Sequence, residues 1–94
     1  MATIHIGEES EGTNCWQYQV QVQTRRQCYQ FVITLNWSDY DHWSHGRKAP
    51  CVVVEAIMRF LLDVQPPEEI SPKFDCAAVR RSYPELDSVL PTMF

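Results

Sequence analysis

One stretch of the sequence decides the fold: Trp16-Gln17-Tyr18-Gln19-Val20-Gln21-Val22-Gln23. Large apolar residues alternate strictly with glutamines along it. Successive side chains of a β-strand point to opposite faces, so this alternation is typical of a half-buried strand with one dry face and one wet face. The pattern therefore predicts a sheet that is covered on one side and open to solvent on the other.

The neighbouring segments predict two further strands. Residues 2–6 alternate apolar and polar side chains, which fits a short first strand. The segment 7–14 is polar and acidic and contains two glycines, so we expect it to be a mobile loop. Residues 28–36 are rich in aromatic and β-branched residues, which favour strands. Together with the alternating stretch, they predict a three-stranded antiparallel meander.

The loop between the second and third strands sets their register. The apolar residues of both strands must share one face, and a two-residue loop at 25–26 or a four-residue loop at 25–28 would each achieve this. The favoured two-residue turns need positive φ, which arginine disfavours. We therefore expect the four-residue loop, with Val22 opposite Phe31.

A long helix is predicted after the strands. Pro50 suits the first turn of a helix, where its missing N–H is not needed, and the helix should end at about Val64, before two consecutive prolines. Charged residues at i, i+4 spacing line the face opposite its main apolar face: Glu55, Arg59 and Asp63. Its apolar residues cover more than one face, because Met58 and Leu62 fall beside this charged stripe. The helix should therefore pack against the sheet and against a second surface.

The remaining segments complete an α+β prediction. We expect residues 37–48 to form an ordered loop, and Asp75 to cap a short helix from Cys76 to about Ser82, followed by a last helical turn within 84–90. The predicted fold class is α+β: a two-layer sandwich in which a three-stranded antiparallel meander (β-β-β) is followed by one long helix packed on its apolar face and short C-terminal helical turns.

The composition is that of an ordinary folded protein. The 94 residues have a formal net charge of −4, with 45% apolar and 21% charged residues, which suits a single domain over 1–94. The only dense basic spots are three surface pairs, Arg25-Arg26, Arg47-Lys48 and Arg80-Arg81. None of them forms a patch, so we do not expect binding to a nucleic-acid backbone. Since no apolar run could span a membrane and the N-terminus lacks the features of a secretory signal, we expect no membrane partner and a cytoplasmic location.

A metal site is one alternative for function. Asp39, Asp41, His42 and His45 fall within seven residues. Imidazole and carboxylate together suit zinc or another divalent first-row metal. The opposing interpretation is that a loop collects Asp and His because these residues cap turns and remain solvated. A divalent metal is the only cofactor that the sequence suggests.

Aromatic residues in the same segment suggest contacts with a partner. Trp37 and Tyr40 lie close to Trp43 in sequence, and exposed Trp and Tyr residues dominate binding hot spots. They could equally fold over the end of the core. With Met58 and Leu62 on the surplus apolar side of the long helix, they are the candidate interaction residues, and the partner would be another protein or a second copy of the chain.

No catalytic motif is present. The three glycines are isolated, so there is no phosphate-binding loop, and the four cysteines show no CxxC spacing. We therefore expect a non-enzymatic binding or interaction protein. The metal-dependent site or small enzyme is the alternative, and an antitoxin-like or RNA-binding-like module is a third possibility, because such modules share this class of fold.

Overall fold

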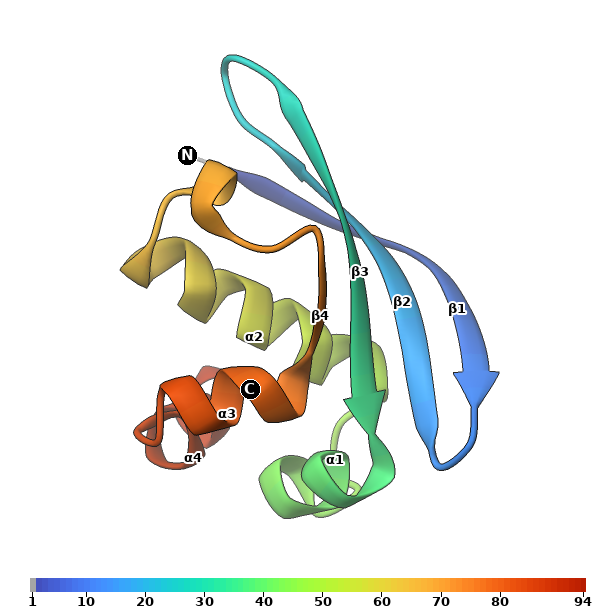
Figure 1. The fold of residues 1–94 in the computed structure, drawn as a ribbon. Helices are drawn as coiled ribbons and strands as arrows, with labels where there is room; N and C mark the ends of the chain where they lie inside the picture. Colours follow the sequence, from blue (N-terminus) through green and yellow to red (C-terminus); the bar gives the residue numbers. More distant parts are fainter. Residues whose placement is uncertain (1) are drawn as a thin grey trace.

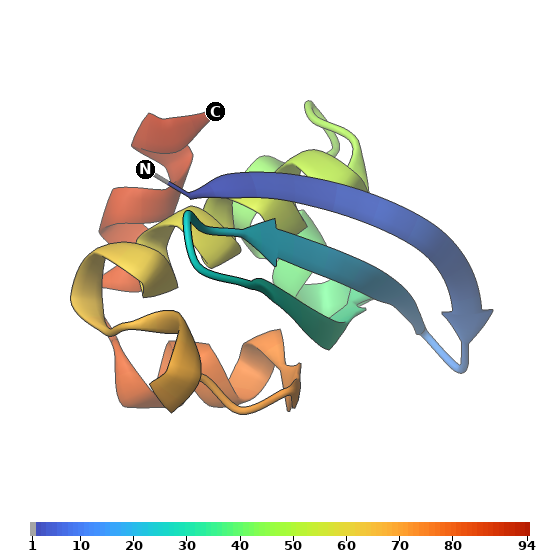
Figure 2. The ribbon, with the colours of Figure 1, turned by 90° about the horizontal axis from the view of Figure 1, so that it is seen from above.

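The alternating stretch forms the second of four strands. The computed structural model describes residues 2–94, in which β2 (Cys15–Gln23) lies between β1 (Thr3–Gly12) and β3 (Cys28–Asn36) in an antiparallel meander. The helices gather on one side of this sheet, as the two views show (Figure 1, Figure 2). The central apolar side chains of β2 and β3 are buried under them, whereas Gln19, Gln21 and Gln23 are exposed on the open face. The predicted dry and wet faces are confirmed.

The first strand is much longer than predicted. It continues through the polar segment that we expected to be a loop, and only residues 13 and 14 form the turn into β2. A β-bulge between Ile6 and Glu9 makes this possible by placing one extra residue in β1. Gly7 suits the bulge, because a Cβ at this position would lie only 3.0 Å from the carbonyl oxygen of Gln19. The extra residue also turns Glu9 towards the covered face, opposite Tyr18.

The predicted register of β2 and β3 is wrong by two residues. Phe31 lies opposite Val20 instead of Val22, although the correct faces are still paired. This is the register of the two-residue loop at 25–26. It is reached without positive φ at either arginine, because the hydroxyl of Thr24 accepts hydrogen bonds from the backbone amides of Arg26 and Gln27, both at 3.2 Å. A side chain therefore supplies the acceptor that the turn requires.

A fourth strand was not predicted. The three residues of β4 (Lys73–Asp75) run parallel to β3 and pair with Val32 to Thr34. The carbonyl of Pro72 accepts a hydrogen bond from the amide of Val32 at 2.8 Å and continues this ladder. So short a strand has no detectable periodicity, and the sequence indicated only the cap that follows it.

The segment predicted as a loop after β3 begins with a helix. This helix, α1 (Trp37–Ser44), is capped by Asn36, whose side-chain oxygen accepts from the amide of Asp39 at 2.7 Å. It ends at His45, a residue with φ of 51°, whose amide donates to the carbonyl of Asp41. A capping side chain with an acidic residue three positions later is a known start signal for helices, and here it outweighs the turn-forming composition.

The long helix agrees with the prediction. It is α2 (Pro50–Val64), and it buries one face against the sheet. Met58, on its surplus apolar side, is completely buried. The 3-10 helix η2 (Leu90–Met93) and α1 both contact α2 and form the second surface that we expected. No helix within residues 2–94 is both long enough and apolar enough to cross a membrane.

The C-terminal third supplies the rest of the helical layer. The short 3-10 helix η1 (Pro67–Glu69) follows α2, and α3 (Cys76–Ser82) is capped by Asp75, whose carboxylate accepts from the amide of Ala77 at 2.8 Å. The helix α4 (Leu86–Val89) gives the predicted last turn and buries Leu86. The boundaries of α3 are those predicted, because cap and stop signals flank it on both sides.

Candidate functional site

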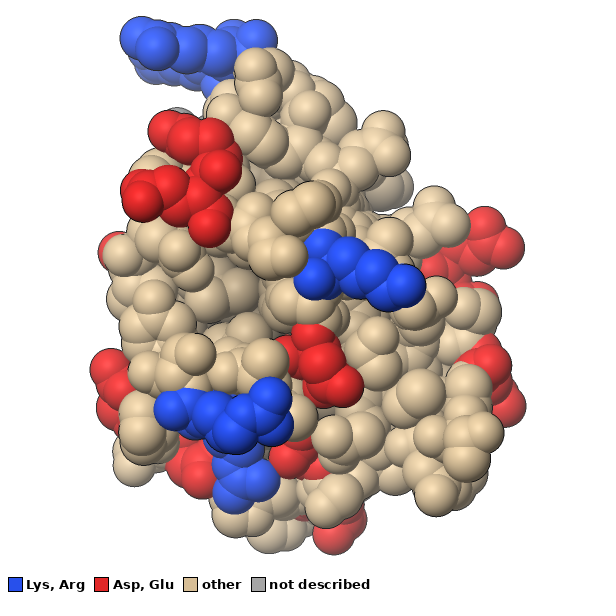
Figure 3. Space-filling model, viewed as in Figure 1, with Lys and Arg blue, Asp and Glu red and all other residues tan. Residues whose placement is uncertain are grey.

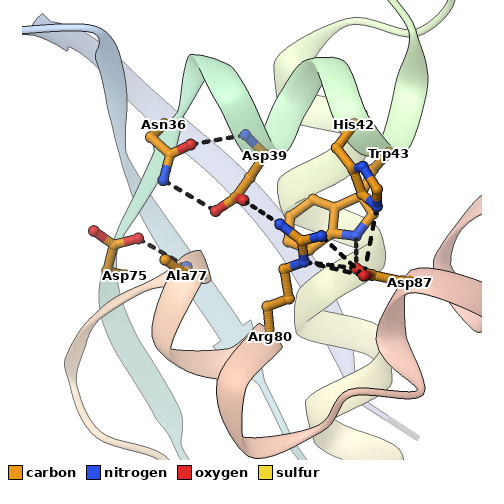
Figure 4. A network of polar contacts seen from close by, with 8 residues as sticks. All are labelled: Asn36, Asp39, His42, Trp43, Asp75, Ala77, Arg80 and Asp87. Atoms are coloured by element: carbon orange, nitrogen blue, oxygen red, sulfur yellow. Dashed lines mark hydrogen bonds and ion pairs between the residues drawn. The ribbon is translucent and has the colours of Figure 1, made fainter.

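A network centred on Arg80 joins α1 to the C-terminal helices. The guanidinium of Arg80 lies between two carboxylates (Figure 4): its Nη1 is 3.0 Å from Oδ1 of Asp39, and its Nε is 2.8 Å from Oδ1 of Asp87. A further hydrogen bond joins its Nη2 to Oδ2 of Asp87 at 2.9 Å. The two-pronged contact with Asp87 is the planar geometry that guanidinium and carboxylate groups favour. Through Asp39 and Asp87, Arg80 fixes α3 against both α1 and α4.

Two side chains of α1 also reach Asp87. The indole Nε1 of Trp43 donates to Oδ1 of Asp87 at 2.8 Å, and Nε2 of His42 lies 3.4 Å from Oδ2. Trp43 is buried, so its indole N–H needs a partner, and Asp87 provides it. The network therefore holds α1 in one orientation.

The groups with shifted pKa values are unsuited to acid–base catalysis. Hydrogen bonds from Arg80 lower the pKa of Asp87 below its usual value, so this carboxylate stays ionised at neutral pH. Burial raises the pKa of Cys76 and, with a hydrogen bond to Glu9, that of Tyr18. A general acid or base works best when its pKa lies near the operating pH, and each of these shifts moves away from neutrality.

An aromatic surface lies on the outer side of α1. It consists of Trp16, Trp37 and Tyr40: the ring centroids of Trp16 and Trp37 are 6.2 Å apart, and those of Trp16 and Tyr40 are 5.1 Å apart in an edge-to-face arrangement. Trp37 is 48% exposed and the other two are half-buried. The amide of Trp37 donates to the carbonyl of Asn14 at 2.9 Å, so the β1–β2 turn fixes the start of α1. The exposed rings thus sit on a rigid support.

Acidic side chains border the aromatic surface. Glu11 is the cross-strand partner of Trp16, on the face to which the bulge in β1 turns it. Asp41, which is exposed, follows Trp37 by one helical turn. Figure 3 shows acidic side chains on the β1 side of the molecule, whereas basic side chains mark the tip of the β2–β3 hairpin. The surface is therefore aromatic at its centre and negative at its edge.

The structure does not bring the four predicted metal ligands together. Asp39 pairs with Arg80 and His42 with Asp87, whereas Asp41 and His45 are exposed. Within residues 2–94, no three His, Cys, Asp or Glu side chains are grouped so that they could hold a metal ion. Metal binding at this segment stays an untested prediction.

The predicted interaction residues separate into two groups. Trp43 and Met58 belong to the core and offer no surface to a partner. Trp37 and Tyr40 share the aromatic surface, whereas Leu62 is half-buried on α2, at another place in the fold. Whether these residues contact a partner stays a prediction.

The sequence did not indicate three residues of this region. Trp16 was assigned only to the dry face of a strand, although its position next to the turn at 13–14 places it at the end of the sheet. Arg80 and its partner Asp39 are 41 positions apart, and Asp87 comes from a third element. No local pattern connects such distant residues.

No protein-family model, curated protein or solved structure matches this chain. The assignment of the site therefore rests on its geometry: an exposed tryptophan on a fixed helix, two neighbouring rings and an acidic edge.

Proposed function

We propose that the chain is a small non-enzymatic binding domain that acts through contact with another protein, and that the aromatic surface of Trp16, Trp37 and Tyr40 makes this contact. One observation carries the proposal: Trp37 is 48% exposed although its ring packs at a tilt against a second tryptophan, Trp16. Tryptophan and tyrosine are the residues most enriched at binding hot spots. An exposed indole beside Trp16, which in turn packs against Tyr40, offers a large apolar contact.

The rigidity of this surface favours binding. The cap at Asn36, the backbone hydrogen bond from Trp37 to Asn14 and the Arg80 network all fix α1. A surface that is ordered before it meets its partner loses little conformational entropy on association. The same contacts that build the fold therefore prepare the aromatic rings for a partner.

The acidic edge favours a basic partner over a second copy of the chain. Self-association through this surface would bring Glu11 and Asp41 of one copy towards the same residues of the other, and like charges at an interface are costly. The chain as a whole has a net charge of −4, which would add to this repulsion. A segment with lysine or arginine would instead gain cation–π and ionic contacts with the surface.

Peptide display tests the proposal. A library of random short peptides is selected on the immobilised protein and counter-selected on a Trp37→Ala variant, while a Val64→Ala variant serves as the control, because Val64 is also exposed (46%) but lies at the end of α2. We expect basic peptides that bind the wild type and the control and lose affinity for Trp37→Ala. Enriched peptides that bind Trp37→Ala equally well would contradict the proposal, and so would a selection that enriches none.

A further inference from the structure

A groove lies at the end of the sheet opposite to α1. It has a volume of about 800 Å³ and is bounded by the β2–β3 hairpin tip, the start of β1, the C-terminal end of α2 and the segment around η1. Pockets that hold small molecules fall in the same range of volume. We propose that this groove binds a small amphipathic carboxylate, a molecule with an apolar body and a single carboxylate head.

The walls of the groove suit an apolar body. Ile4, Tyr29, Leu62 and Met93 each pack partly against the core and line the groove with the surface that remains. They come from four elements that are far apart in the sequence, so the groove is a product of the folded chain. Apolar walls of this kind supply most of the contact area in small-molecule sites, and a few polar groups fix the orientation of the ligand.

Arginines supply those polar groups. Arg25, Arg26 and Arg59 line the groove, which makes three of the eight basic residues of the chain. Within the described residues, Arg25 and Arg26 form no ion pair, and Arg59 has only an exposed contact with Glu55 at 3.4 Å. A guanidinium presents parallel N–H donors that match the two oxygens of a carboxylate. The basic side chains at the hairpin tip stand out from the body of the molecule in Figure 3.

Two acidic residues limit the charge of the ligand. Asp63 and Glu68 also line the groove, and Oε2 of Glu68 lies 3.4 Å from the hydroxyl of Tyr29. Three arginines and two acids leave a lining charge of +1, which one carboxylate would neutralise. A phosphate monoester has nearly two negative charges at neutral pH, which exceeds the lining charge, and an alkylammonium would be repelled by the arginines.

Titration with matched probes tests the chemistry of the site. Decanoate, decylamine and butyrate are each added to the isotope-labelled protein below the micelle-forming concentration, and backbone amide shifts are followed by NMR. We expect decanoate to bind about tenfold more tightly than decylamine, which has the same tail and the opposite charge, and more tightly than butyrate, which has the same head and little tail. The shifted amides should include those of Thr24 and Leu62.

A pair of double variants tests the arginines. Arg25→Gln with Arg26→Gln should weaken decanoate binding about tenfold, since both charged donors are lost. Arg47→Gln with Lys48→Gln removes the same charge from the exposed segment between α1 and α2 and should leave the affinity unchanged. The hairpin should keep its fold, because Thr24 binds backbone amides and not the arginine side chains.

Three results would overturn the proposal. Equal affinity for decanoate and decylamine would indicate detergent-like adsorption. Equal weakening by both double variants would indicate a general effect of net charge, and amide shifts confined to residues outside the groove would indicate another site. None of these results concerns the aromatic surface, which lies at the other end of the sheet.

Discussion

The two ends of the β2–β3 hairpin are built in opposite ways. At the α1 end, α1 is joined by side chains to α3 and α4, and the indole of Trp43 shares the carboxylate of Asp87 with Arg80. At the tip, the turn is held by a backbone hydrogen bond from Thr24 to Gln27 and by the hydroxyl of Thr24, and a groove separates the hairpin from the end of α2. The α1 end is closed by polar contacts, and the tip end is open.

This difference separates two kinds of binding surface. The closed end can present rings such as Trp37 in a fixed orientation, which suits contact with a folded or extended protein segment. The open end leaves apolar walls and arginines facing a volume of about 800 Å³, which suits a ligand that enters the fold. The substitutions below test how far the two ends differ.

The largest effect is expected at the closed end, from Trp43→Ala. Trp43 is 2% exposed and its indole N–H binds Asp87, so its removal leaves a large cavity and should lower the free energy of unfolding by about 3–5 kcal/mol. Trp37→Ala is the control on the same helix and should cost about 1 kcal/mol, because Trp37 is half-exposed. Urea unfolding followed by circular dichroism measures both. Equal losses of unfolding free energy in the two variants would mean that the buried side chain of Trp43 stabilises the α1 end no more than an exposed ring does.

The second effect tests the Arg80 network. Asp39→Ala removes a carboxylate that is 5% exposed and bonded to Arg80 and Asn36, and we expect a loss of about 2 kcal/mol, the scale of hydrogen bonds to charged groups. Asp41→Ala, an exposed aspartate on the same helix, should change stability by less than about 0.5 kcal/mol. Thermal melts of both variants measure the two losses of stability. If Asp39→Ala lost no more than Asp41→Ala, the Arg80 network would contribute nothing to stability.

Local patterns predicted most of the fold but not the contacts across it. The alternation at 16–23 gave the meander and its faces, and the prolines and caps gave α2 and α3. The errors occurred where a single contact outweighs a local preference: the Thr24 hydroxyl permits a register that arginine disfavours, and the bulge at Gly7 lets an acidic segment remain in a strand. Such contacts depend on a partner strand that no local pattern shows.

The candidate sites were less predictable than the fold. The sequence drew attention to Trp37 and Tyr40, and the structure adds Trp16 because the turn at 13–14 brings it beside α1. Arg80 appeared only as one of a surface pair with Arg81. The three arginines of the groove meet because the β2–β3 turn lies near the end of α2, and the distance along the chain hides this arrangement.

A smaller effect is expected at the open end, from Thr24→Val. This change keeps the shape of the side chain and removes the hydroxyl that accepts from two amides and donates to the carbonyl of Gln27. We expect a loss of about 1 kcal/mol and faster amide exchange confined to the hairpin tip. Thr13→Val, in the turn of β1 and β2, makes the same change and should cost less. If Thr24→Val instead destabilised the protein as much as Trp43→Ala, the tip would be as essential as the α1 end.

The smallest effect is the pH dependence of Asp87. Hydrogen bonds from Arg80 lower its pKa in the folded chain, and the indole of Trp43 and the charge of His42 act in the same direction. A carboxyl with a lowered folded pKa adds stability above its unfolded pKa, about 4, and this stability is lost as the pH falls through the lower folded value. Because Asp87 and Arg80 are each 34% exposed, solvent screening should keep the contribution of this aspartate below about 1 kcal/mol.

Asp87→Asn isolates this contribution from the other carboxyl groups. Asparagine keeps the shape and can still accept from Trp43, so the variant should be slightly less stable than the wild type at pH 7. As the pH is lowered through the acid range, Asp87 of the wild type becomes protonated and the difference in unfolding free energy should shrink towards zero. Asp63→Asn is the control, since Asp63 is exposed on α2 and has no ion-pair partner within residues 2–94. A difference that stays constant with pH would mean that the charge of Asp87 does not stabilise the closed end, and that its hydrogen bonds act through geometry alone.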